Sequence, residues 1–123
     1  NEDRLESWKA YYSYLEILLT KGHIELPVIP TDCKHNAHMF YIKVNDLKTR
    51  TELLRHLHEK GITAAFHYIP LHSSPAGRRF STFTGQDIYT TKESERLIRL
   101  PMFYGLEMND IDKVCGAIYE FFI

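Results

Sequence analysis

Cysteine is scarce in this sequence. Only Cys33 and Cys115 occur among 123 residues, and their spacing matches no metal motif, in which cysteines come in close pairs. We expect no secretory segment, and therefore reduced thiols in a cytoplasmic protein. An apolar run long enough to span a bilayer is also missing. These absences exclude a disulfide scaffold and a membrane-spanning helix from the expected fold.

An excess of charge of one sign is likewise absent. The chain carries 16 acidic and 15 basic side chains, with a formal net charge of −1, so no strong field attracts nucleic acid or an anionic membrane. The sequence has no glycine-rich phosphate loop, no Ser-His-Asp order and no HExxH helix. Its length fits one domain, residues 1–123, with a real core.

What the sequence does contain begins with a helical pattern. Apolar residues recur at three- and four-residue steps from Leu5 to Leu19, which is typical of a helix with one buried face. The helix is predicted from Glu2 to Lys21, over residues 2–21, because Gly22 is a natural C-terminal stop.

Aromatic residues widen the apolar face of this helix, since Trp8, Tyr11, Tyr12 and Tyr14 cover more than one side. Core packing is one explanation. However, so wide an arc needs partners on two sides, which a small domain does not supply. Asn1 is not an initiator methionine, so we expect an excised or processed piece of a longer protein, or a chain trimmed of a few residues.

The chain beyond this helix divides into a connector and a core. Residues 22–37 are predicted to be an extended linker, because Pro27 and Pro30 exclude a helix there. The α+β core is expected over residues 38–123, and no internal repeat interrupts it.

Alternation of apolar and polar residues predicts a strand over His38–Val44. A capping box at Thr49–Glu52 opens the next predicted helix, which Gly61 ends. Ile62–His67 is a predicted second strand. The stretch Tyr68–Tyr89 is an unusually long loop for a compact domain, and such loops are often functional.

A second capping box, Thr90–Glu93, predicts a helix that runs through Ile98. Leu100–Phe103 is then expected to be a short extended piece, and Asn109 is expected to cap the last helix. The resulting fold class is α+β, with a small, mostly antiparallel sheet and helices packed on it.

Candidate chemistry is densest where the second strand ends, in the run Phe66–His72. His67 and Tyr68 could bind a phosphate or sugar hydroxyl while a ring packs against a base. The alternative is that both are satisfied side chains at a sheet edge. Residues alone leave both interpretations open.

Histidines raise a further alternative, a zinc-dependent hydrolase. His35, His38, His67 and His72 lie near the ends of the two main strands, and three histidines with one open position suit catalytic zinc. Without an accompanying zinc motif the spacing gives this little support. The arginine pair Arg78–Arg79 is expected to be solvated surface.

Four segments are jointly distinctive: His35–Ile42, Phe66–Gly77, Tyr89–Leu97 and Arg99–Pro101. Together they resemble the C-terminal domain of the DegT family of sugar-nucleotide aminotransferases, over nearly the whole chain. The HYxPLH and YTTKESERL runs are the specific ones. Thr90–Thr91 stands where many members have a proline, which favours a narrower subgroup.

The resemblance implies the C-terminal small domain of a fold-type-I, pyridoxal phosphate (PLP) dependent transferase. It implies a homodimer in which an absent large domain carries the cofactor and its Schiff-base lysine. No catalytic, cofactor or metal residue is therefore expected in this chain, which should be inactive alone. The implied substrates are a TDP-linked 4-keto-6-deoxyhexose and glutamate, and the implied product serves lipopolysaccharide or another surface polysaccharide.

The resemblance also favours a role for the strand-end cluster in substrate binding. It implies that Tyr68 and His67 lie at the edge of the sugar-nucleotide pocket, with Asn36 and His38 as further candidates. A free-standing ligand-binding module without catalysis is the main alternative function, and the zinc hydrolase is the other.

Overall fold

The centre of the fold is a three-stranded antiparallel sheet in the order β1-β3-β2. The computed structural model describes residues 2–123. Along the chain the elements are α1 (Glu2–Thr20), β1 (Phe40–Lys43), α2 (Leu47–Glu59), β2 (Ala65–Phe66), η1 (Leu71–Ser73), α3 (Pro75–Phe80), α4 (Thr90–Arg96), β3 (Leu97–Leu100) and α5 (Met108–Phe122). The α+β class and the antiparallel sheet with packed helices are confirmed.

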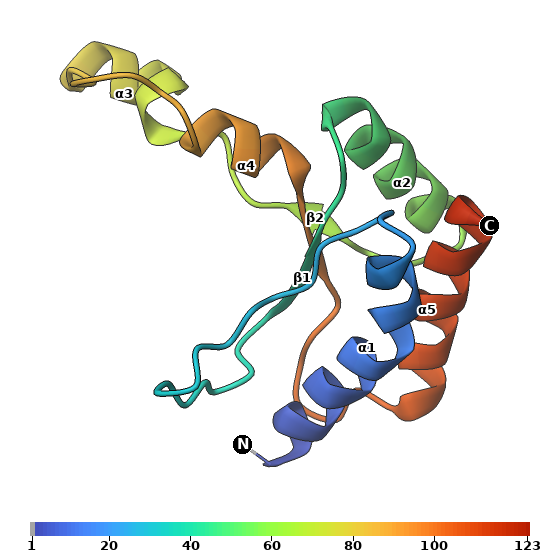
Figure 1. Cartoon of the computed structure of the whole chain (residues 1–123). Coiled ribbons are helices and arrows are strands. Elements are labelled where there is room, and N and C mark those ends of the chain that lie inside the picture. The colour runs from blue at the N-terminus through green and yellow to red at the C-terminus, as the bar shows by residue number, and fades with distance from the viewer. Residues whose placement is uncertain (1) are drawn as a thin grey trace.

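Helices cover one side of this sheet, where α1, α2 and α5 gather (Figure 1). Every second residue of β1 and β3 faces them and is buried; these are Phe40, Ile42, Ile98 and Leu100, and Val44 after β1 continues the pattern. The helices contribute Tyr11, Leu15, Leu18, Leu53, Leu57, Ile111, Val114 and Ile118. This layer is a continuous apolar core of the kind that dominates folding stability.

The aromatic residues of α1 are divided between core and surface. Trp8 and Tyr11 are buried, and the Tyr11 hydroxyl donates a 2.9 Å hydrogen bond to the carbonyl of Pro101. Tyr14 remains 46% exposed, and Ile17 is exposed as well. Within residues 2–123 the wide apolar arc of α1 is thus only partly covered. Asn1, on which the expectation of a processed start rests, lies outside the described residues.

The predicted linker over residues 22–37 is more structured than expected. Glu25 forms an antiparallel bridge with Lys43, through backbone hydrogen bonds of 2.8 and 3.0 Å. Ile24 and Leu26 are buried beside it. The start of the connector therefore extends the sheet edge, an arrangement that local sequence does not reveal because the partner lies in a distant strand.

The helix C-termini predicted at glycines appear in the structure, whereas the predicted helix N-termini differ from the observed ones. Gly22 and Gly61 follow α1 and α2 with φ of 75°, as C-terminal stops require. The capping box predicted at Thr49 is wrong, because α2 begins at Leu47 and the Asp46 carboxylate accepts from the Thr49 N–H at 2.7 Å. An aspartate one turn earlier satisfies the free amides first.

The other two predicted caps are also wrong. At α4 the Asp87 carboxylate accepts from the Thr91 N–H at 3.2 Å, while Glu93 pairs with Lys43 instead of closing a capping box. Helix α5 begins at Met108, so Asn109 lies inside it. In each case a tertiary or neighbouring polar contact replaces the local motif.

The largest correction concerns Leu97–Ile98, predicted as the end of a helix. These residues begin β3, the central strand, in which Ile98 lies opposite both Ile42 and Phe66. Strand pairing on both sides overrides the helical pattern. The expected strand Ile62–His67 is shorter, Ala65–Phe66, and the expected loop Tyr68–Tyr89 contains η1 and α3.

Candidate functional site

The four predicted site residues lie at opposite ends of the sheet. Both β1 and β2 run antiparallel to β3 and hence parallel to each other. Asn36 and His38 precede β1, whereas His67 and Tyr68 follow β2. Within this chain, the structure therefore brings together His67 and Tyr68 and separates them from the other pair.

His67 and Tyr68 form an aromatic pair at the start of the segment that leads to α3. Their ring centroids are 4.2 Å apart, with the rings nearly perpendicular, a favourable edge-to-face arrangement. The Tyr68 side chain is 66% exposed and His67 is half-buried. Burial and the positive charge of Arg99 lower the pKa of the His67 imidazole, which favours its neutral form, able to donate and to accept one hydrogen bond.

A cavity of about 340 Å³ lies beside Tyr68. Its walls come from α2, the end of β2 and α4, and are formed by Leu47, Arg50, Phe66, Tyr68, Ile69, Pro70, Ser73, Thr91, Ser94 and Glu95. The phenol therefore borders a space that mixes apolar and polar groups, as small-ligand sites do.

Arg50 is the cation of this cavity. Its guanidinium lies 4.8 Å from the centroid of the Phe66 ring, and Nη1 donates to the carbonyl of Ser94 at 2.9 Å. The Nε atom is buried and has no hydrogen-bond partner among the residues described. Burial lowers the pKa of Arg50. Sequence reasoning missed this residue, because its only signal was a basic position on the exposed side of a predicted helix.

The segment between β2 and α4 forms a projecting arm, residues 68–89, that carries α3 away from the sheet (Figure 1). His72 Nε2 lies 2.9 Å from an Asp87 carboxylate oxygen, and its ring lies over Phe83 with centroids 4.4 Å apart. Asp87 also accepts from the Thr91 hydroxyl. These contacts tie η1 to the returning half of the arm and to the start of α4.

Tight packing fixes the tip of the arm. The Ser74 hydroxyl caps α3 by accepting from the Gly77 N–H at 3.0 Å. A Cβ atom at Gly77 would lie 1.6 Å from the carbonyl oxygen of Leu71. Glycine is therefore required where η1 meets α3.

At the other end of the sheet, Asn36 and His38 belong to a local turn. The Asn36 side-chain oxygen accepts from the His38 N–H at 3.0 Å, and both residues are exposed. Such a turn is a common structural role for asparagine. His35, beside them, packs against Trp8 with ring centroids 4.6 Å apart. Their predicted part in substrate binding stays a prediction.

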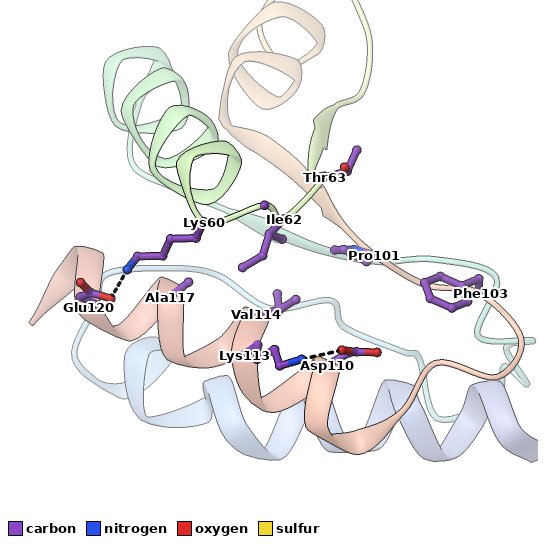
Figure 2. A pocket seen from close by; sticks show the side chains of 11 residues that line it. Lys60, Ile62, Thr63, Pro101, Phe103, Asp110, Lys113, Val114, Ala117 and Glu120 are labelled. Carbon is purple, nitrogen blue, oxygen red and sulfur yellow. Dashed lines mark hydrogen bonds and ion pairs between the residues drawn. The ribbon is translucent and has the colours of Figure 1, made fainter.

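A larger cavity, of about 910 Å³, lies elsewhere, between the end of α2, the segment after β3 and α5 (Figure 2). None of the four predicted site residues lines it. Figure 2 shows its charged side chains in pairs: Lys60 with Glu120 at 2.7 Å and Lys113 with Asp110 at 3.2 Å. Apolar residues from several short segments form its floor, so no single sequence motif predicts this cavity.

Four charged residues join the connector, β1 and α4. Lys43 lies 3.3 Å from Glu25 and 2.7 Å from Glu93, and Arg96 pairs with both carboxylates. The Arg96 guanidinium lowers the pKa of Glu25, and the Lys43 ammonium lowers the pKa of Glu93. All four charges are balanced within the cluster, which gives it a structural role.

The described residues gather no metal site, and the lysines that line the larger cavity do not fit the Schiff-base site of PLP. Among residues 2–123 no three His, Cys, Asp or Glu side chains gather to hold a metal ion. A PLP lysine needs an amine free of carboxylates at a cavity wall. The cavity-lining lysines, Lys60 and Lys113, are both paired with carboxylates.

The helices described within residues 2–123 include none with the length and apolar character needed to cross a membrane.

Solved structures that share this fold include aminotransferases. DesV of S. venezuelae, in complex with a ketimine intermediate, matches with a TM-score of 0.85 and 29% identity, over 98% of this chain and 31% of that one. A DegT DnrJ EryC1 StrS aminotransferase from Brucella abortus matches with a TM-score of 0.80 and 26% identity, over 98% and 30%.

NtdA of Bacillus subtilis, with bound cofactor PMP, matches with a TM-score of 0.80 and 25% identity, over 97% of this chain and 27% of that one. This chain thus spans 27–31% of the length of these solved structures. The family model of the DegT/DnrJ/EryC1/StrS aminotransferases matches residues 1–119. The chain therefore belongs to the DegT/DnrJ/EryC1/StrS aminotransferase family.

Proposed function

We propose that this chain is the C-terminal small domain, residues 1–123, of a PLP-dependent sugar-nucleotide aminotransferase. The full-length protein converts a TDP-linked 4-keto-6-deoxyhexose to the 4-amino sugar nucleotide, with glutamate as amino donor, for surface polysaccharide synthesis in the cytoplasm. The observation that carries the proposal is the match of the family model to residues 1–119. The HYxPLH run at residues 67–72 supports the narrower substrate class.

The task proposed for this domain is to form one wall of the substrate pocket. Tyr68 presents an exposed phenol beside a 340 Å³ cavity, and the half-buried imidazole of His67 supports its ring. A phenol can donate to a phosphate or sugar oxygen while its ring covers apolar surface. His67 would orient Tyr68 and offer a second hydrogen bond. Asn36 and His38 would act only if the large domain or a second subunit brings them near substrate.

Cofactor chemistry belongs to the absent large domain in this proposal. PLP, when bound, supplies an electron sink during transfer of the amino group. Because the family resemblance implies that the Schiff-base lysine lies in that absent domain, the chain alone should be inactive. The homodimer is supported by apolar side chains that the arm leaves uncovered in this chain, among them Leu71, Phe80 and Tyr89, since such exposed groups are common at interfaces.

The test compares the isolated chain with the full-length protein that contains it. PLP absorbance and amination of the TDP-keto-sugar should appear only in the full-length protein. Tyr68→Phe should lower kcat/KM roughly tenfold, as expected when one substrate hydrogen bond is lost. Tyr104→Phe is the matched control, because Tyr104 is 82% exposed and lines neither cavity. A full-length protein that binds no PLP would favour the free-standing binding module instead.

A further inference from the structure

A row of residues crosses the side of the sheet opposite the helices. Tyr41, Arg99 and Ala65 are direct neighbours on β1, β3 and β2. They alternate with the buried residues Ile42 and Ile98, so they face away from the core. None of the three is buried in this chain. His67 follows Ala65 by two residues and extends the row toward the arm.

Arg99 differs from the other cations of this region. Arg96 and Lys43 each pair with two carboxylates, and Arg50 donates to a carbonyl. Arg99, although half-buried, forms no ion pair and no side-chain hydrogen bond with any residue from 2 to 123. A partly desolvated guanidinium in the middle of a sheet attracts an anion strongly, because both its hydration and its protein partners are reduced.

The surroundings of Arg99 suit an oxyanion. Burial, and after it the charge of Arg99, lowers the pKa of the His67 imidazole, which favours a neutral donor over a second, competing cation. Tyr41, across the sheet, carries a phenol. One cation and two neutral hydrogen-bonding groups thus border the same face, next to the aromatic pair that includes Tyr68.

We propose that Arg99 binds an oxyanion of a substrate, by paired N–H donation from its guanidinium to a phosphate or a carboxylate. The inference rests on the proposed function, which supplies two such groups: the diphosphate of the nucleotide-linked sugar and the carboxylates of the amino donor. Arginine suits both, because its planar fork matches two oxygens of either anion. The open face of the sheet is then a part of the substrate pocket.

Kinetics of the full-length enzyme test the proposal and identify the anion. In Arg99→Gln, the KM of one substrate should rise about tenfold or more, as for other lost charge-assisted hydrogen bonds. A rise for the keto-sugar nucleotide assigns Arg99 to phosphate, and a rise for the amino donor assigns it to carboxylate. Arg99→Lys should recover part of the loss. Arg78→Gln, an exposed change on α3, should leave both KM values unchanged.

Direct binding makes the test independent of activity. Calorimetric titration of the full-length protein with inorganic pyrophosphate and with glutamate should show binding of one of them, which Arg99→Gln abolishes. Equal KM values and equal binding in the wild type and Arg99→Gln would overturn the inference, as would a change confined to thermal stability. If the wild type fails to aminate yet binds an anion through Arg99, the proposed function fails and the anion site stands.

Discussion

The two sides of the sheet differ in what fixes their residues. On the helix side, Phe40, Ile42 and Ile98 are fully buried, and each contacts a continuous apolar layer. On the other side, Tyr41, Arg99 and His67 remain partly exposed, and the arm carries apolar residues into solvent. Burial explains the first set completely. The second set has no such explanation within the described residues, and the candidates Arg99, His67 and Tyr68 lie on this side or at the start of the arm.

A substitution on the helix side of the sheet should cause the largest loss of stability. Phe40→Ala removes a fully buried ring that packs against Trp8 and Tyr11, with centroids 5.3 and 5.1 Å away. The free energy of unfolding should fall by about 3–5 kcal/mol. Phe80→Ala, at a position 78% exposed, should change it by less than about 0.5 kcal/mol. Urea denaturation measures both free energies. Equal losses in the two variants would contradict the predicted difference between the core and the arm.

A smaller and more local effect is expected in the arm. Gly77→Ala forces a methyl group against the Leu71 carbonyl, and such overpacking typically costs about 1–3 kcal/mol. Because the arm contacts itself more than the core, the change should loosen residues 68–89 without unfolding the sheet. Hydrogen exchange should therefore increase in the arm alone. Ala76→Gly, one residue earlier in the same helix, is the control. Faster exchange throughout β1 and β3 in Gly77→Ala would contradict the prediction that the arm loosens independently of the sheet.

The smallest effect concerns the charged cluster at the sheet edge. Glu25 and Glu93 have pKa values lowered by Arg96 and Lys43, so their stabilisation is full above the unfolded pKa and is lost as pH falls through the lower, folded value. Stability should thus decline below about pH 4.5. Because these side chains are partly exposed, each should contribute only about 0.2–1 kcal/mol.

Glu93→Gln checks this assignment. The variant should show a weaker dependence of thermal stability on pH in the acid range than the wild type. Glu107→Gln, which changes an exposed carboxylate with no ion pair among the described residues, is the control. An unchanged acid profile in Glu93→Gln would mean that other carboxylates control acid unfolding.

Sequence patterns predicted the features that depend on nearby residues. The alternation at Phe40, Ile42 and Val44 and the stops at Gly22 and Gly61 all appear in the structure. Features that depend on distant partners were missed. Leu97–Ile98 became a strand because β1 and β2 pair on both sides of it, and Glu25 joined the sheet through Lys43.

The same limit applies to the candidate site. Tyr68 and His67 could be selected from one short run of unusual residues. Arg50 and Arg99 could not, since their significance depends on a missing partner in three dimensions. A basic residue in a strand or helix normally indicates a solvated face, and only the fold shows which cations remain without a carboxylate.

The position of β3 has a consequence for biosynthesis. Among the three strands, β1 and β2 pair with β3 and not with each other, and β3 is the last of the three to leave the ribosome. Until Leu100 has emerged, the two earlier strands lack their strand partner, apart from the Glu25 bridge to Lys43, and their apolar residues stay available for wrong associations. The nascent domain thus assembles late, over long sequence separations, a topology typical of slower folding.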